Sequence, residues 1–174
     1  AETKYDQYGQ PIKATTETKY DQYGNPIKVE TRYDQQGHPI TTETKHDHLG
    51  QQVKTETKQD QSGNTIKTET TYDTKGQPLK SSETKTDSRG QTMIKEETTY
   101  DNHGQPIKSE ETKYDQYGTP IKTDEIKYDQ YGTPIKTEKT TYDKYGQPIK
   151  STDTKYDSSG RPIKGSEVKY DQYG

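Results

Sequence analysis

The stretch KYDQYGTPIK occupies residues 113–122 and recurs letter for letter at 127–136, and near-copies of it fill most of the chain. Its core, Asp-x-x-Gly, occurs 13 times in 174 residues, with one spacing of 15 residues, then four of 13 and seven of 14. We therefore interpret 1–174 as a single array of 13 turn units. The 13-residue units occupy 21–73, and the regular 14-residue units occupy 74–174.

The Asp-x-x-Gly core predicts a reverse turn. An Asp at its first position can accept a hydrogen bond from the backbone two residues on, and a Gly at its last position suits the left-handed conformation. A type I turn followed by a left-handed Gly makes a three-residue hairpin loop with a bulge at the glycine. In that register Tyr114 pairs with Pro120 at a site without cross-strand hydrogen bonds, where the missing N–H of proline does least harm.

The segment PIKTDEIKY, residues 120–128, predicts a β-strand, because charged and β-branched residues alternate in it and Pro stands only at its start. Pro120 and Tyr128 are eight residues apart, so we expect them to share one face of the sheet. Ile121, Glu125 and Lys127 are then expected on the other face.

The 13-residue units have a different parity. The offset from Pro26 to Tyr33 is seven residues, and a slip of one residue moves a side chain to the other face. We therefore expect a bulge or different packing within 21–73, and this stretch is predicted to be the irregular part. It also lacks the usual Tyr or Pro at His46, Gln52, Gln59 and Thr65.

One turn and one strand per unit predict an all-β antiparallel meander. The alternative is a β-solenoid with one unit per coil, but a 14-residue coil needs at least two corners and each unit carries one strong corner signal. In-register coils would also stack like charges on each other. In the meander, the Lys two residues before Asp is expected opposite the aliphatic residue, and the Thr three before Asp opposite Lys.

The composition limits how such a chain is stabilised. Apolar residues make up 20% of it and the mean hydropathy is −1.59, which is closer to disordered than to globular proteins. One unit buries too little to fold alone, so neighbouring units, other copies of the chain or an attached glycan must contribute. The interleaved charges, net −3, give no footprint for nucleic acid, and no apolar run is long enough for membrane insertion.

Few side chains are candidates for chemistry. His46, Asp47 and His48 lie close enough in sequence for a metal cluster, but we interpret them as drift within the repeat. One Asp per turn supplies too few oxygen ligands for calcium, and the absence of Cys excludes disulfides. Thr-x-Thr pairs are typical of ice-binding arrays, although many units break the pair. We assign no catalytic, cofactor-binding or metal-binding residue, and expect no cofactor.

Two resemblances accompany these motifs. The repeat, of which YDQYGNPIK at 20–28 is an example, resembles the YD repeats of Rhs-like and teneurin-like proteins over the whole chain. That resemblance implies extracellular or secreted β-hairpin repeats that wind into large sheets. Separately, DQYGNP at 21–26 is similar to the Y-segment of plant dehydrins, a disordered and stress-protective family. Neither family implies catalytic residues.

These observations together predict a non-enzymatic structural repeat protein, outside the cell or at its surface. We expect a segment of a longer fibre or matrix stabilised by lateral packing, since the last unit stops at Gly174 in mid-phrase. The expected partners are other copies of the chain, with an attached or bound glycan as a further candidate. The alternatives are a dehydrin-like hydrophilic protectant and a carbohydrate- or ice-binding module.

Overall fold

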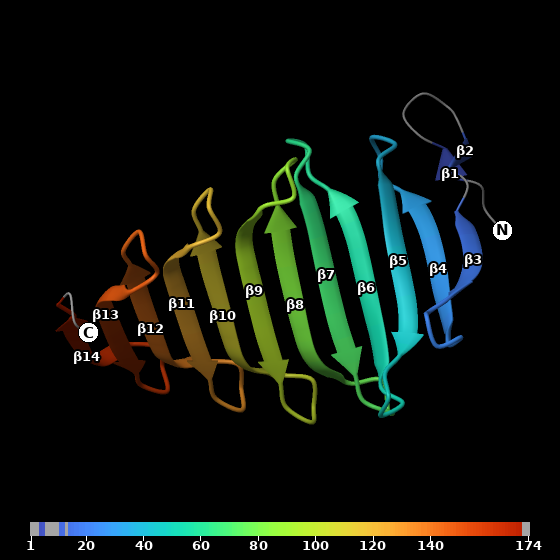
Figure 1. Ribbon diagram of the computed structural model, residues 1–174. Helices are drawn as coiled ribbons and strands as arrows, with labels where there is room; N and C mark the ends of the chain where they lie inside the picture. Colours follow the sequence, from blue (N-terminus) through green and yellow to red (C-terminus); the bar gives the residue numbers. More distant parts are fainter. Residues whose placement is uncertain (1–3, 6–10, 13, 172–174) are drawn as a thin grey trace.

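The computed structural model describes residues 4–5, 11–12 and 14–171, and these residues form β-strands joined by turns. Strands β3 to β14 make one 12-stranded antiparallel sheet in which each strand pairs with the one before it and the one after it in the chain (Figure 1). Strands β1 and β2 pair with each other separately. The bounds are β1 Lys4–Tyr5, β2 Pro11–Ile12, β3 Thr15–Tyr20, β4 Pro26–Tyr33, β5 Pro39–His46, β6 Gln52–Gln59, β7 Thr65–Tyr72, β8 Pro78–Thr86, β9 Thr92–Tyr100, β10 Pro106–Tyr114, β11 Pro120–Tyr128, β12 Pro134–Tyr142, β13 Pro148–Tyr156 and β14 Pro162–Lys169.

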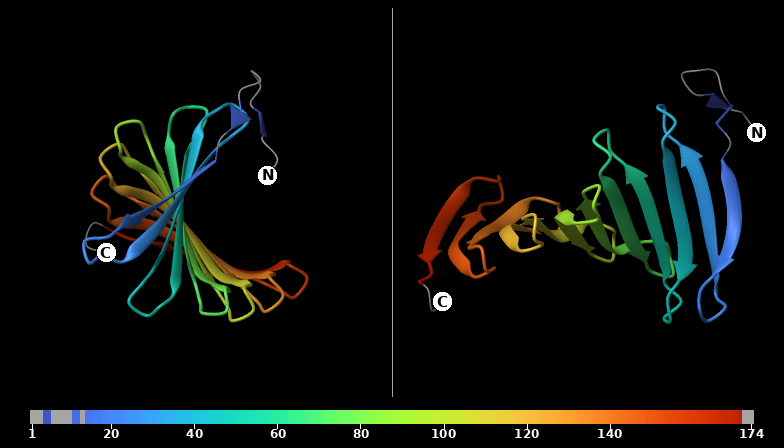
Figure 2. Two further views of the ribbon diagram at one scale, coloured as in Figure 1. Left: turned by 90° about the vertical axis from the view of Figure 1, so that its right-hand side faces the viewer. Right: turned by 45° about the horizontal axis from the view of Figure 1, so that its top comes forward.

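This arrangement confirms the predicted all-β meander. The sheet is open: β3 and β14 lie at its opposite ends and do not pair with each other to close a barrel (Figure 1). It is also strongly twisted, as the two views of Figure 2 show. Such a twist is expected of strands built from L-residues.

The turns have the predicted geometry. In the turn at Asp115, the Gly118 N–H donates to the Asp115 carbonyl at 3.1 Å, and the Asp115 N–H donates to the Thr119 carbonyl at 2.9 Å. The same two bonds recur in all eleven described turns, and the turn glycines have φ between 74° and 87°. The predicted turns at Asp6 and Asp171 fall wholly or partly outside the described residues.

The turn carboxylate does more than the sequence predicted. Oδ1 of Asp115 accepts the N–H of Tyr117 at 2.8 Å, two residues on, and also the N–H of Thr119 at 2.9 Å, four residues on. The second bond is the unpredicted one, and the pair recurs at every described turn. One oxygen thus satisfies two backbone donors, which explains why the position is Asp throughout.

The bulges lie in the 14-residue units, so the expectation that placed a bulge in 21–73 is wrong. Tyr114 pairs with Pro120 and Lys113 with Lys122, which leaves Ile121 without a partner. The 13-residue units pair without interruption on both sides of the turn. Each 14-residue unit therefore carries its extra residue as a β-bulge, at Leu79, Met93, Ile107, Ile121, Ile135, Ile149 and Ile163.

The bulge also overturns the expected faces. Because Ile121 is unpaired, the alternation of side chains shifts by one, and Pro120 lies on the face opposite Tyr128. Glu125 and Lys127, expected opposite Pro120, share its face. Both unit lengths therefore have one outcome: the Pro that begins a strand and the Tyr that ends it lie on opposite faces.

The predicted cross-strand partners are correct only where there is no bulge. In the 13-residue units Lys19 lies opposite Ile27, and Thr18 lies opposite Lys28. In the 14-residue units the bulge removes the aliphatic residue from the pairing, so that Lys113 lies opposite Lys122. The meander thus places like charges side by side, and the charge argument against a solenoid was invalid. The single corner per unit was the sound argument.

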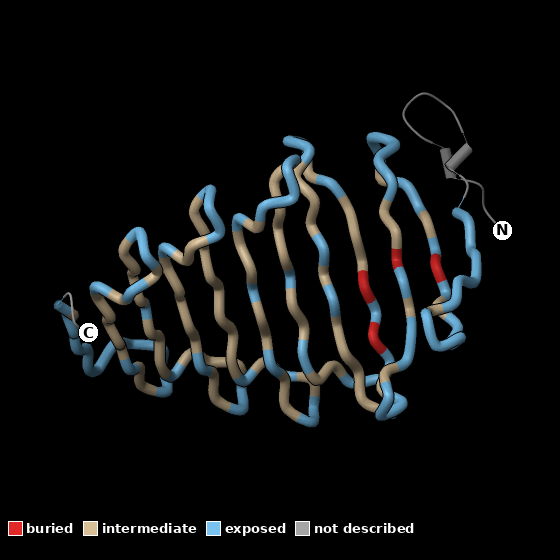
Figure 3. The backbone as a smooth tube through the Cα atoms, in the orientation of Figure 1, coloured by how far each residue is buried: buried red, intermediate tan, exposed pale blue. Residues whose placement is uncertain are grey.

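The sheet is a single layer with almost no interior. The chain exposes 12291 Å² of surface, whereas a compact protein of 20.0 kDa exposes about 8,700 Å². Among the described residues, Val29, Thr42, Val53 and Thr55 are buried, and all four lie on β4, β5 and β6 (Figure 3). The described part of the chain contains no helix long and apolar enough to span a membrane.

Candidate functional surface

The sheet has two faces, and its turns form two rows, one at each end of the strands; we call each row of turns an edge. We call the edge that holds the turns at Asp34, Asp60, Asp87, Asp115 and Asp143 the upper edge, and the edge with the other described turns the lower edge (Figure 1). Face 1 is the face that carries Lys108 and Glu110, and face 2 carries Ser109 and Glu111. Directly paired residues share a face, so the strand register assigns every paired side chain to one of the two.

Charged side chains form rows that run across the strands. On face 1, acidic residues lie opposite one another from β9 to β13, and a lysine row runs beside them from β10 to β14. The acidic row is Glu97, Glu110, Glu125, Glu138 and Asp153, and the lysine row is Lys108, Lys127, Lys136, Lys155 and Lys164. Face 2 has a shorter acidic row on β8 to β11, made of Glu83, Glu96, Glu111 and Asp124.

Ion pairs between neighbouring rows offset the repulsion within each row. Lys108 Nζ lies 2.8 Å from a carboxylate oxygen of Glu125 and 3.1 Å from one of Glu110, and these hydrogen bonds raise the pKa of its ammonium group. Hydrogen bonds from Lys95 and then Lys80 lower the pKa of Glu97. The rows are therefore mutually neutralising, and among the described residues no group of His, Asp and Glu is arranged to hold a metal ion.

An uncharged stripe of rings follows the lower edge on face 2. Each lower-edge hairpin of the 14-residue region pairs a Tyr with a Pro, and the four hairpins place these pairs on the same face. Tyr and Pro thus alternate on successive strands from β7 to β14. We call this set the long stripe: Tyr72, Pro78, Tyr100, Pro106, Tyr128, Pro134, Tyr156 and Pro162.

Three of the four tyrosines of the long stripe are bonded through their hydroxyls to the neighbouring strand. A hydrogen bond of 3.0 Å joins the hydroxyls of Tyr100 and Ser81, and one of 3.1 Å joins those of Tyr128 and Ser109. The hydroxyl of Tyr156 is bonded in the same way to Thr137 at 3.2 Å. These three rings are therefore tethered at both ends, and all three residues are half-buried.

A second, shorter stripe follows the upper edge on face 1. Tyr114 pairs with Pro120 and Tyr142 with Pro148, so four rings alternate from β10 to β13. We call these four residues the short stripe. It begins at β10 because Thr86 and Thr92 stand on β8 and β9, at the positions that Tyr and Pro occupy in the next two hairpins of this edge.

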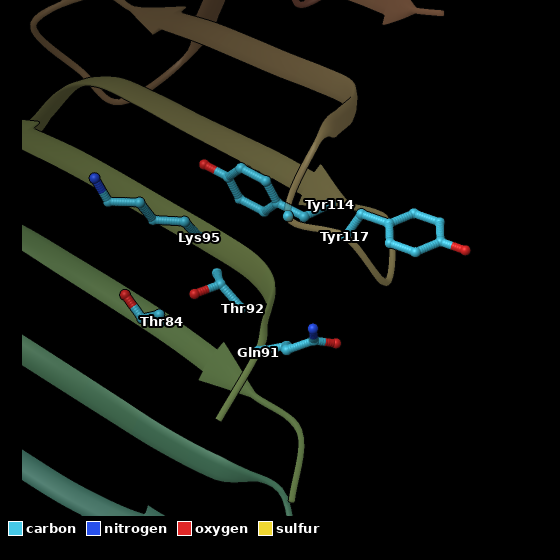
Figure 4. Close-up of a pocket in the computed structure, with 7 residues that line it drawn as sticks. Thr84, Gln91, Thr92, Lys95, Tyr114 and Tyr117 are labelled. Carbon is cyan, nitrogen blue, oxygen red and sulfur yellow. The ribbon is translucent and has the colours of Figure 1, made fainter. Parts of the chain in front are cut away.

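The end of the short stripe is marked by an open hollow of about 390 Å³, lined by Tyr114 with Thr84, Gln91, Thr92 and Lys95 (Figure 4). In Figure 4 the hydroxyl of Tyr114 points back over the sheet toward Lys95, whereas Tyr117 points away from it. A further hollow of about 320 Å³ at the same edge is lined in part by Ile94 of face 2 and by the bulge residues Met93 and Ile121.

Of the residues considered for metal binding, His46 lies on face 2 in the same row as the long stripe, because it pairs with Gln52 and Gln52 pairs with Tyr72. His46 pairs with Gln52 at the end of β5, while the Asp47 carboxylate accepts the N–H groups of Leu49 and Gln51. The stripes themselves were only half predicted. Each Tyr–Pro pair is the expected one, but the division into two stripes on opposite faces depends on the bulges. The seven-residue offset from Pro26 to Tyr33, found in the 13-residue units, predicts the observed faces when it is applied to every unit.

No protein-family model and no curated protein sequence matches this chain.

Proposed function

We propose that this chain is a non-enzymatic structural protein, an open β-sheet segment of a fibre or matrix held together by contacts between copies. The observation that carries the proposal is the excess exposure: 12291 Å² of surface and four buried residues in the described part of a 20.0 kDa chain. A sheet with both faces in water gains stability when another surface covers part of them.

The periodicity of the surface supports the same proposal. Identical side-chain types recur on successive or alternate strands, in charged rows and in the two stripes. A surface that repeats along one direction suits a partner that repeats in the same way, such as another copy of the chain. The resemblance to YD repeats is the basis for including an extracellular or surface location in the proposal.

The continuous ladder of paired strands favours this function over a disordered, dehydrin-like protectant. The twist of the sheet in Figure 2 also disfavours ice binding, because threonines on a twisted sheet do not form a flat lattice.

A carbohydrate-binding module is the second candidate. It is favoured by the hollow beside Tyr114, whose lining combines Tyr114 and Tyr117 with the neutral polar groups of Thr84, Gln91 and Thr92 (Figure 4). Titration of soluble oligosaccharides into labelled protein would shift the amide signals of Thr84 and Thr92 if this candidate is correct.

Electron microscopy together with far-UV circular dichroism tests the structural proposal. We expect a β-sheet spectrum, and filaments or ribbons of regular width as the protein concentration rises. A random-coil spectrum that persists at high concentration would contradict it, and so would β-structured particles that stay dispersed at every concentration.

A further inference from the structure

We infer that the long stripe is a self-association surface, and that its partner is the long stripe of a second copy of this chain. The inference deepens the proposed function and rests on it, since it names the residues through which copies meet.

The first argument is that the stripe is complementary to itself. Tyr and Pro alternate from strand to strand over β7 to β14. A second stripe that runs in the same direction and is displaced by one strand sets its Tyr rings against Pro rings. Because the stripe follows an edge, two sheets need to overlap only there, and the charged rows stay in water.

The second argument comes from the tyrosine hydroxyls. Tyr100, Tyr128 and Tyr156 already bond to Ser81, Ser109 and Thr137. Their polar ends are therefore satisfied within the sheet, and the outward surface is an apolar ring face beside a proline ring. Such a surface suits another ring better than a ligand that needs free hydrogen-bonding groups.

The area available predicts a weak contact. A fully buried Tyr removes about 150–250 Å² from water, and a half-buried ring on the sheet keeps roughly a third of that. Eight rings then contribute roughly 400 Å² per copy, so a pair buries about 800 Å², below the ~1,200 Å² at which stable specific interfaces begin. Association through the long stripe should therefore be reversible and dependent on concentration.

The short stripe makes the assembly open-ended. Its four rings lie on the other face and at the other edge from the long stripe, so both stripes can be occupied at once. It offers about half the apolar surface, so its contact is the weaker of the two. We therefore expect assembly in two steps. Copies first pair through their long stripes, and these pairs then join through their short stripes at higher concentration.

Three double variants separate these contacts in sedimentation velocity experiments over a range of protein concentration. The long-stripe variant is Tyr100→Gln with Tyr128→Gln, the short-stripe variant is Tyr114→Gln with Tyr142→Gln, and the control is Tyr117→Gln with Tyr131→Gln. The control removes two rings at hairpin tips that are 80% and 78% exposed and belong to neither stripe. Gln is a suitable replacement because Gln59 already stands in the β6–β7 hairpin at the position that Tyr holds in the stripes.

We expect the wild type and the control to pass from monomer to dimer to longer species. In the long-stripe variant the association constant of the dimer should fall by about tenfold or more. The short-stripe variant should form dimers but no longer species. Wild-type protein that stays monomeric throughout overturns the proposed function together with this inference. Wild-type protein that associates while the long-stripe variant associates equally well overturns only the inference.

Circular dichroism establishes that each variant is folded. If the long-stripe variant unfolds, Pro106→Thr with Pro134→Thr replaces it, because Thr65 and Thr92 show that the hairpin accepts Thr at this position. This second pair keeps the tethered tyrosines, so unchanged dimerisation of it would overturn the assignment in the same way.

Discussion

At the scale of single residues, the turn is the feature that makes the repeat possible. One Asp carboxylate accepts two backbone N–H groups, and one Gly adopts a left-handed conformation that other residues resist. The four hydrogen bonds of each turn involve residues close in sequence, so a hairpin corner forms without help from distant parts of the chain. Because each turn is stabilised by local hydrogen bonds, it does not depend on a hydrophobic core.

The turn glycine gives a direct test of this view. Gly118 has φ of 83°, and a Cβ placed on it would meet nothing within 4 Å, so strain alone governs a substitution there. We expect Gly118→Ala to destabilise the chain by about 1 kcal/mol and Gly118→Asn by less, because Asn tolerates the left-handed region. Urea midpoints measure both, and equal losses for the two variants would contradict the strain argument.

The turn carboxylates also predict acid sensitivity. The backbone N–H bonds from Gln105 and then His103 hold the pKa of Asp101 below its ordinary value of 3.8, and the bond from Gln91 does the same for Asp87. A folded-state pKa below the unfolded value means that the stabilisation is complete above about pH 4 and is lost as the pH falls through the folded pKa.

Carbon-detected NMR titration of the Asp87 and Asp101 carboxyl groups checks this expectation, with the urea-unfolded chain as the reference. We expect both midpoints to lie lower in the folded chain. Midpoints at or above the unfolded reference would show that the carboxylates do not hold the turn through these bonds.

At the scale of elements, the two unit lengths are two ways to build the same strand. A 13-residue unit pairs throughout, and a 14-residue unit leaves one aliphatic residue unpaired as a bulge. In both, consecutive turns fall on opposite edges and consecutive tyrosines on opposite faces. The bulge is thus a length adjustment that preserves the faces of the sheet.

Deleting the bulge residue tests this equivalence. Removing Ile121 turns its unit into a 13-residue unit, so we expect the sheet to persist with Tyr128 still bonded to Ser109. Ile121 is 43% exposed, so little buried surface is lost and the change in stability should be about 1 kcal/mol or less. Circular dichroism and the melting temperature measure it.

A matched control removes both Ile121 and Lys122, which leaves no bulge to absorb the second deletion and moves Tyr128 to the other face. We expect this variant to be clearly less stable than the single deletion. Equal stability of the two variants would contradict the role assigned to the bulge.

These elements show what the sequence could and could not predict. The turn at Asp115 and the Tyr114–Pro120 pair were predictable because a few neighbouring residues fix them. The face of Tyr128 was not, since it depends on whether Ile121 finds a partner on β10, and that is a property of the register between strands. The stripes depend on those faces, so the candidate surface was predicted as pairs but not as two separate stripes.

At the scale of the whole molecule, the chain is a twisted single-layer ribbon. Its 12 main strands add side by side without closing, and its two faces carry charged rows and uncharged stripes in place of a core. Each strand contacts its neighbours in the chain, so stability accumulates along the array as it does in other repeat proteins. The same geometry leaves both stripes open to further copies.

Small-angle X-ray scattering of dilute, monomeric protein tests this central claim most directly. Twelve strands at about 4.8 Å spacing and about 30 Å length give a ribbon whose radius of gyration is about 20 Å. A compact domain of 174 residues would have a radius near 16 Å, and an unfolded chain one near 44 Å. We predict about 20 Å with the scattering profile of a flattened, elongated particle, and either of the other two values would contradict the open single-layer sheet.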